Sequence, residues 1–567
     1  MNSTRSLVAN QASVLILAAA VFFTTGLSAS AQNVQHLSIT QPGGMPGLPV
    51  MTGIQRVTNG VTVTWDGPSG YYQVLQKVNL NDSKWVNWGK ATNLVRRATI
   101  TTITSNSFFR VFGPSPQYAG SQACAVCHQN IHDTETKTPH AGAFTNAQFV
   151  AEGGQTNSSC LACHTVGYGL PTGFVSKGDR NTNPRLAGVQ CESCHGPAAN
   201  HAANPDDPIA IPRVELAATV CGGCHTGPQH PTYDEWKTSE HAEVVADVVT
   251  AMNSSTNNIN SCGRCHSGSA RLSLVKKEPL PVGDADVGIV CATCHDPHMT
   301  YVHTNVLNGM YTNAVSGIAV TNNQLGAVYT NQLRYPFSST NNYSLTTSAV
   351  FTNAYNINVC AQCHNDRGAS RTNSVAAPHH SPQYNMLLGT VGELDSGLPP
   401  HQPAFHALVE KQCAGCHMQT ANFQAGPPEI PAVTGHKFEV NSYEACAQCH
   451  GTAANAQGLV ALAQGFIAPW IQFEKGQLDE WAATKAPASL WTKYGTRAWE
   501  YTTPGDLSPG GPGPTTAEQA LIPVNIQKAR YNLYLVLYDG SYGVHNINYT
   551  ITLLDATDGW IQEELTK

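Results

Sequence analysis

The eighteen cysteines of this chain all belong to one repeated motif, in which two cysteines lie three residues apart and a histidine follows directly. Two thiols at this spacing can form thioether bonds to one haem, and the adjacent histidine then lies against the iron as an axial ligand. The nine motifs, numbered first to ninth in chain order, are Cys124-Cys127-His128, Cys160-Cys163-His164, Cys191-Cys194-His195, Cys221-Cys224-His225, Cys262-Cys265-His266, Cys291-Cys294-His295, Cys360-Cys363-His364, Cys413-Cys416-His417 and Cys446-Cys449-His450.

Other uses of paired cysteines fit this pattern poorly. Structural zinc takes two cysteine pairs per ion, whereas nine is an odd number of pairs and zinc would not require a histidine in the same place each time. Disulfides within each pair would not select histidine either. A thioredoxin-like redox motif occurs once in a domain. The motifs therefore predict nine covalently attached haem c groups, and this leaves no cysteine for a structural disulfide.

The composition agrees with a chain that is organised around prosthetic groups. Charged residues make up 12% of the sequence, about half of their usual share. The 49 glycines and 34 prolines indicate many loops and turns. We expect a largely irregular and α-helical chain wrapped around a haem array, with the haems replacing much of the apolar core.

A low-spin electron-transfer haem needs a second axial ligand, and fourteen histidines lie outside the motifs. His36 precedes the haem region and is a poor candidate. His298 lies too near its own motif to reach the other face of the same haem, and of His379 and His380 we expect only one to ligate. The predicted second ligands are His140, His201, His230, His241, His298, His379, His406, His436 and His545.

The first 31 residues have the pattern of an export signal. Arg5 supplies a positive charge, residues 14–23 are apolar, and Ala29-Ser30-Ala31 is a small-residue cleavage site, so the mature chain is expected to start at Gln32. A membrane anchor is the alternative, but the apolar run is short for a span and is followed by a cleavage site. The expected location is periplasmic or extracellular, without a membrane span after cleavage.

Residues 32–113 contain no cysteine and have a β pattern. Residues 61–65, 71–78, 98–101 and 108–112 are predicted strands, and Asn59-Gly60 and Asp66-Gly67 are hairpin signals. This segment resembles a small sandwich of the fibronectin type III kind. Its expected role is attachment, spacing or partner contact, or a passive cap on the rest of the chain.

Residues 114–450 form the predicted nine-haem domain, with a polar insertion at 301–359 that is rich in Thr and Asn. Residues 451–567 are predicted to be a helical segment that packs on the haem domain and brings His545 to one of the irons. Helices are expected at 459–485 and 517–538, interrupted by Pro469 and Pro523.

Several stretches resemble one superfamily of multihaem cytochromes. Residues 189–197 (VQCESCHGP) followed by His201, together with residues 138–141 (TPHA), resemble the tetrahaem cytochrome that partners hydroxylamine oxidoreductase. Residues 529–533 (ARYNL) and 543–546 (GVHN) resemble the C-terminal helices of pentahaem nitrite reductase and octahaem hydroxylamine oxidoreductase. The resemblance covers about residues 120–555 and implies that His545 ligates a haem. One departure is that all nine motifs end in histidine, whereas the nitrite reductase usually has lysine at one proximal position.

Two functions are expected to compete. The first is an electron carrier with a chain of bis-histidine haems, in respiratory or extracellular electron transfer, whose partners are other redox proteins. The second is an oxidoreductase for a small nitrogen or sulfur compound at one five-coordinate haem. The formal net charge of −7 argues against nucleic acid as a partner. The acidic, loop-rich chain also permits a third role, self-association into a haem-stacked polymer.

Overall fold

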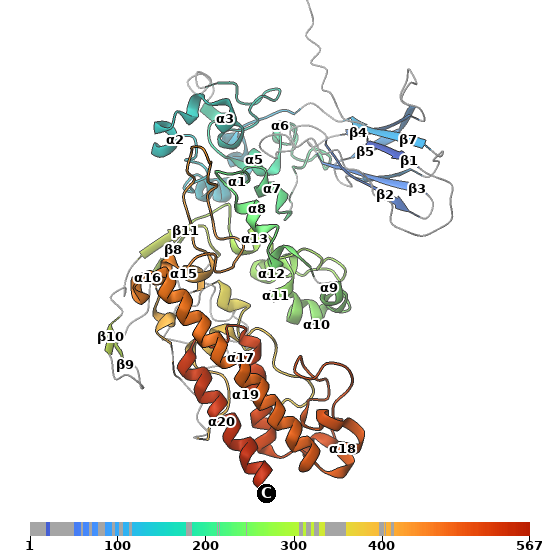
Figure 1. Ribbon diagram of the computed structural model, residues 1–567. Coiled ribbons are helices and arrows are strands. Elements are labelled where there is room, and N and C mark those ends of the chain that lie inside the picture. Colours follow the sequence, from blue (N-terminus) through green and yellow to red (C-terminus); the bar gives the residue numbers. More distant parts are fainter. Residues whose placement is uncertain are drawn as a thin grey trace, which may run out of the picture. The chain divides into compact units, whose positions relative to one another are not determined.

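The computed structural model (Figure 1) describes residues 116–567 except 177–183, 213, 215, 245, 305–309, 313–318, 322–327, 335–358, 396–401, 403 and 410–412, and before residue 116 it describes seven strands. The chain folds into two compact units. The first contains residues 1–226 and 297–300, and the second contains residues 227–296 and 301–567. The boundary therefore falls between the fourth and fifth motifs.

The N-terminal strands form two small antiparallel sheets, ordered β1-β7-β4-β5 and β2-β3-β6. One hydrophobic cluster draws side chains from both sheets, among them Trp65 and Phe109. The face-to-face sandwich itself stays a prediction. The strands are β1 (Ala19–Phe22), β2 (Val50–Val57), β3 (Gly60–Asp66), β4 (Tyr71–Lys77), β5 (Val86–Thr92), β6 (Arg97–Ile100) and β7 (Asn106–Phe112).

The alternation in β3 decides which of its side chains are buried. Val61, Val63 and Trp65 are buried, whereas the threonines between them are half-buried. Val57 pairs with Gly60 across the predicted Asn59-Gly60 turn, so β2 and β3 form the expected hairpin. The hairpin expected at Asp66-Gly67 was wrong, because the strands on either side, β3 and β4, belong to different sheets. Strands β2 and β5 were not predicted. Strand β1 lies inside the predicted export signal and pairs with β7, while the rest of that signal lies outside the described residues.

The rest of the first unit consists of short helices around a small core. Tyr118, Phe144 and Phe174 are central members of that core. The helices are α1 (Ser121–Glu135), α2 (Ala147–Ala151), η1 (Gly154–Thr156), α3 (Ser158–His164), η2 (Pro184–Leu186), α5 (Cys191–His195), α6 (Ala199–Ala203) and α7 (Thr219–Gly222).

The second unit begins with more short helices, continues into the insertion, and ends in long helices. The insertion has two antiparallel pairs, β8 (Tyr301–Thr304) with β11 (Val328–Asn331) and β9 (Met310–Thr312) with β10 (Ala319–Thr321). The short helices are α8 (Thr232–Trp236), η3 (Glu240–Ala242), α9 (Ala246–Met252), α10 (Thr256–Asn258), η4 (Ile259–Gly263), α11 (Arg264–His266), α12 (Gly268–Lys276), α13 (Cys291–Cys294), η7 (Cys360–Gln362), α14 (Gln383–Leu388), η8 (Phe405–Leu408), α15 (Cys413–His417) and α16 (Glu444–His450).

The largest hydrophobic core of the second unit lies between the C-terminal helices. Figure 1 shows α17, α19 and α20 side by side, and these helices contact one another. In α19 every residue from position 529 to 536 is buried, as expected of a helix surrounded by packing partners. The elements are α17 (Ala453–Thr484), α18 (Ala488–Tyr494), η9 (Gly495–Trp499), η10 (Glu518–Leu521), α19 (Val524–Asp539) and α20 (Ile547–Thr566).

The two prolines of this region behave differently. Pro523 separates η10 from α19, as predicted. Pro469 does not interrupt its helix, because α17 continues through it from Ala453 to Thr484, so that expectation was wrong. The proline ring crowds the carbonyl four residues back, which here belongs to Gly465, and a glycine lets the backbone adjust. Among the described residues, no helix has the length and apolarity needed to cross a membrane.

Candidate haem-binding sites

All eighteen cysteines lie in the described residues, and none of them forms a disulfide. The motifs lie on short helical turns, such as α3, α5 and α15. One helical turn brings residues three apart onto the same face, so both thiols of a motif point to one side and the histidine follows beside them. Four motifs belong to the first unit and five to the second.

Seven motif histidines face a second histidine ring. The ring centroids of each pair lie between 5.7 and 6.3 Å apart. In each pair, the histidine that lies outside the motifs is one of the predicted second ligands. In the first unit the pairs are His195–His298 (6.0 Å) and His225–His140 (6.1 Å). In the second unit they are His266–His379 (5.7 Å), His364–His241 (6.1 Å), His450–His406 (6.2 Å), His295–His436 (6.3 Å) and His417–His545 (6.3 Å).

These separations fit an iron between the two rings. A metal–imidazole bond is about 2 Å long, so two imidazoles on opposite sides of one metal have centroids about 6 Å apart. Two histidines alone are an incomplete ligand set, and the described residues contain no group of three or more His, Cys, Asp or Glu that could hold a metal ion. A porphyrin supplies the four missing nitrogens, so the donor set fits haem c better than a protein-only metal site.

Several imidazoles are oriented by a hydrogen bond at Nδ1, which leaves Nε2 for the metal. His406 Nδ1 lies 3.0 Å from the Val544 carbonyl, and His417 Nδ1 lies 3.1 Å from the Phe438 carbonyl. His436 is held in the same way by the Thr434 carbonyl (3.0 Å). The other contacts of this kind are His164 Nδ1 to Ala143 O (3.0 Å) and His379 Nδ1 to Ser381 Oγ (3.1 Å).

Burial keeps several of these rings neutral. It lowers the pKa of His241 to about 4 and, helped by the Arg367 charge, that of His379 to about 3. Neutral imidazole is the form that ligates metals. His545 differs, because burial is outweighed by the Asp539 carboxylate, which raises its pKa. His545 Nδ1 lies 2.7 Å from Asp539 Oδ1.

Motifs distant in sequence lie next to one another. In the first unit, Cys124 hydrogen-bonds to Cys191 of the third motif, and Cys163 to Cys224 of the fourth. In the second unit, the fifth motif contacts the seventh and the seventh contacts the eighth, through the thiol pairs Cys265–Cys363 and Cys360–Cys413. The predicted attachment points of different haems thus lie close together within each unit.

Glu192, between the cysteines of the third motif, joins this motif to the first. Its buried carboxylate accepts hydrogen bonds from three backbone N–H groups, those of Ala119 (3.0 Å), Gly120 (2.7 Å) and Ala198 (2.8 Å). Ala119 and Gly120 precede α1, which carries the first motif, and Ala198 precedes α6, which carries His201. Sequence analysis did not single out this residue.

The first and second motifs have no such pair. Among the described residues, neither His128 nor His164 has a ring contact with another histidine. His164 instead stacks on Phe149, with centroids 4.0 Å apart and rings 9° from parallel. Helix α6 contacts α1, so His201 remains the candidate partner for His128, and its buried Nδ1 has no hydrogen-bond partner. His230 is exposed and is not assigned to a motif.

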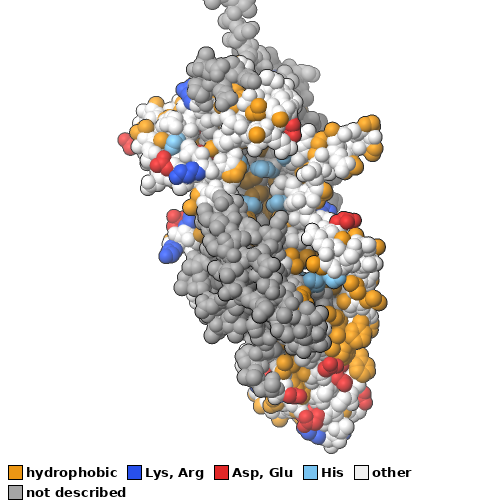
Figure 2. Space-filling model, turned by 90° about the vertical axis from the view of Figure 1, so that its left-hand side faces the viewer, with side chains coloured by type: hydrophobic (Ala, Val, Ile, Leu, Met, Phe, Trp, Pro, Cys, Tyr) orange, Lys and Arg blue, Asp and Glu red, His pale blue; other side chains and the backbone are white. Residues whose placement is uncertain are grey.

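Several histidines are exposed at the surface rather than buried in a protein core. Figure 2 shows several histidine side chains at the surface of the face that it draws. His128, His225 and His364 are exposed. Exposed histidines next to the cysteine pairs are what a polypeptide shell around covalently attached haems would present.

Comparison with known proteins agrees with this chemistry. The profile of the family described as "Cytochrome c554 and c-prime" matches residues 123–196 and 220–298. The C-type polyheme cytochrome OmcB of Geobacter sulfurreducens is 23% identical over 53% of this chain and 36% of its own length. The multiheme cytochrome MtrA of Shewanella baltica is 26% identical over 37% of this chain and 63% of its own length. The alignments thus span less than two thirds of either relative.

Among solved structures, the outer cell wall cytochrome OcwA aligns with 78% of this chain and 100% of its own, at 18% identity and a TM-score of 0.48. The sequence matches and the repeated motif together relate this chain to multihaem c-type cytochromes, to which it is similar.

Proposed function

We propose that this protein is an exported carrier of electrons with nine haem c groups, most of them held between two histidines. The observation that carries the proposal is the set of seven facing histidine pairs, each with one ring from a motif and one from elsewhere in the chain. At these seven places two imidazoles would hold the haem iron, which would leave no coordination site for a substrate. Haem c supplies a one-electron iron couple when it is bound.

The residues of the chain support transport in three ways. The paired histidines would hold each iron in the same ligand field before and after an electron arrives. The thiol contacts between motifs set neighbouring attachment points side by side within each unit. The Nδ1 hydrogen bonds fix the rings in place. Respiratory or extracellular electron transfer, with other redox proteins as partners, is the proposed setting.

A second function has one observation in its favour. His164 of the second motif stacks on Phe149 and has no histidine facing it among the described residues. A haem held there by a single histidine would be open to a small nitrogen or sulfur compound. In this alternative the protein is an oxidoreductase at that haem, and the other sites supply or remove its electrons.

The electron paramagnetic resonance spectrum of the oxidised protein separates the two functions, with total haem measured as the pyridine haemochrome. We expect nine haems per chain and low-spin signals alone. A high-spin signal that shifts when nitrite or hydroxylamine is added would make the oxidoreductase the better proposal. Fewer than nine haems in fully matured protein would contradict the attachment scheme.

Self-association into a haem-stacked polymer is a separate proposal. Sedimentation over a range of protein concentrations tests it, and a strict monomer would exclude it.

A further inference from the structure

His545 differs from the other oriented imidazoles in the group that accepts its Nδ1 proton. His406, His417 and His436 point Nδ1 at neutral backbone carbonyls. His545 instead meets the carboxylate of Asp539 at 2.7 Å, and the Asp539 side chain is only 2% exposed. A charge-assisted hydrogen bond of this kind is stronger than a neutral one, and it makes the imidazole a more basic ligand.

The position of Asp539 is unfavourable for a carboxylate in other respects. It is the last residue of α19, where the helix dipole disfavours negative charge. Within the described part of the chain, its carboxylate contacts only Ser541 and His545, so no lysine or arginine neutralises it. A buried anion at this end of a helix costs stability unless a partner compensates it. His545 is that partner.

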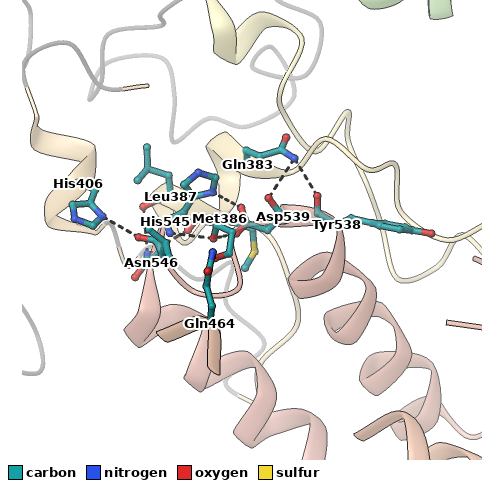
Figure 3. Close-up of polar contacts among 11 residues, drawn as sticks. Gln383, Met386, Leu387, His406, Gln464, Tyr538, Asp539, His545 and Asn546 are labelled. Atoms are coloured by element: carbon teal, nitrogen blue, oxygen red, sulfur yellow. Dashed lines mark hydrogen bonds and ion pairs between the residues drawn. The ribbon is translucent and has the colours of Figure 1, made fainter. Parts of the chain in front are cut away.

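The surrounding loop holds this pair in a defined arrangement, as Figure 3 shows. The Ser541 hydroxyl contacts the second oxygen of Asp539 and accepts the backbone N–H of His545 (3.1 Å). The Asn546 amide donates to the Gln402 carbonyl (2.7 Å). The Gln383 amide donates to the Tyr538 carbonyl (3.1 Å; Figure 3). The segment between α19 and α20 is therefore fixed on both sides of His545.

The same segment also serves the neighbouring site. The backbone carbonyl of Val544, directly before His545, accepts a hydrogen bond from His406 Nδ1 at 3.0 Å. His406 faces His450 of the ninth motif, and His545 faces His417 of the eighth. One short loop thus gives two adjacent sites different acceptors, a carboxylate for the eighth motif and a neutral carbonyl for the ninth.

We propose that Asp539 is a tuning residue that lowers the reduction potential of the haem at the eighth motif below that of the haem at the ninth. The inference rests on the proposed function, in which His417 and His545 share one iron. By drawing the Nδ1 proton toward itself, Asp539 increases the electron donation of Nε2, which favours ferric over ferrous iron. The haem of the ninth motif is then reduced before that of the eighth.

The test is a spectroelectrochemical titration of the complete haem-loaded protein carrying Asp539→Asn. The amide keeps the shape and one acceptor oxygen but removes the charge. We expect the potential of one haem to rise, one low-spin resonance to shift and the other components to stay unchanged, with nine haems per chain. Asp539→Glu should remain close to the wild type. Asp479→Asn is the control, because that carboxylate, which pairs with Lys475 and Trp499, lies outside the histidine pairs.

Unchanged potentials in a fully loaded Asp539→Asn protein would overturn the proposal. Loss of a low-spin signal in that variant would also overturn it, since Asp539 would then only hold the ligand. Failure of the electron-carrier function has a different signature, a substrate-sensitive high-spin signal in the wild type. That signal can be measured before any variant is made.

Discussion

The ring centroids of His266 and His379 lie 5.7 Å apart, the shortest separation among the seven facing histidine pairs. His380, the next residue along the chain, stacks on His379 at 4.3 Å and is itself exposed. Of these two adjacent histidines, His379 is the one that the sequence analysis names as a predicted ligand. The structure places His379 opposite the motif histidine and His380 behind it.

We therefore predict that His379→Ala and His380→Ala have different effects on spin state. Loss of His379 should leave one haem of nine with a single strong axial ligand. A high-spin resonance that integrates to one haem per chain should therefore appear. Loss of His380 should leave all signals low-spin. Electron paramagnetic resonance of the oxidised proteins checks this, and the reverse result would assign the ligand to His380.

His298 provides a second test of ligation. It lies three residues after the sixth motif, yet its ring faces His195 of the third motif at 6.0 Å. His298→Ala should convert one haem to high-spin. His298→Met is the matched variant, because methionine is also an axial haem ligand and raises the potential. We expect it to keep the haem low-spin with a higher potential. A low-spin spectrum identical to the wild type in both variants would exclude His298 as a ligand.

The sequence predicted the chemistry of the sites better than their pairing. A motif is local, so its cysteines and histidine can be assigned from spacing alone. A pair such as His241–His364 depends on how distant segments meet, which no local pattern contains. His298 was the exception, because its short distance from its own motif excluded its own haem. The different positions of His379 and His380 likewise depend on tertiary structure.

The residues that support the ligands were harder to predict. Asp539 precedes a glycine at the end of a predicted helix, a combination that indicates a turn and nothing more. Glu192 occupies a variable position of a motif, and its role depends on backbone N–H groups from two other segments. Pro469 was predicted to interrupt a helix. The burial of Ile467 and Ile471 on the same helix outweighs the unfavourable helix propensity of this proline.

Glu192 should be important for the stability of the first unit. Glu192→Gln replaces one carboxylate oxygen by a donor that faces backbone N–H groups. Hydrogen bonds to a charged group are worth about 1.5–3 kcal/mol each, so we expect a loss of about 3 kcal/mol. Thermal unfolding followed by haem absorbance measures it. Glu152→Gln is the control, since that exposed side chain accepts one hydrogen bond, from Gln148. Equal midpoints for the two variants would contradict the role of Glu192.

The C-terminal helices should become less stable as the pH rises. Burial raises the pKa of Glu474 to about 7, and the charges of Asp555 and Asp558 act in the same direction, against the hydrogen bond from Trp470. Burial also raises the pKa of Glu500 to about 7. An unfolded chain releases these protons at about pH 4.3. The folded state therefore holds more protons between about pH 4 and 7, and its stability falls with rising pH across that window.

Glu474→Gln isolates one of these contributions. The amide oxygen can still accept from Trp470 Nε1, which lies 2.7 Å from Glu474 Oε1, but it carries no charge. At pH 8 the variant should be more stable than the wild type by about 1–3 kcal/mol, the usual cost of an unsatisfied buried polar group. At pH 4.5 the two should be nearly equal, because Glu474 is then protonated in the folded protein. Denaturant unfolding followed by circular dichroism at both pH values measures the difference, with the exposed Glu480→Gln of the same helix as control. A gain that is the same at both pH values would contradict the prediction, because the ionisation of Glu474 would then not change stability across this pH range.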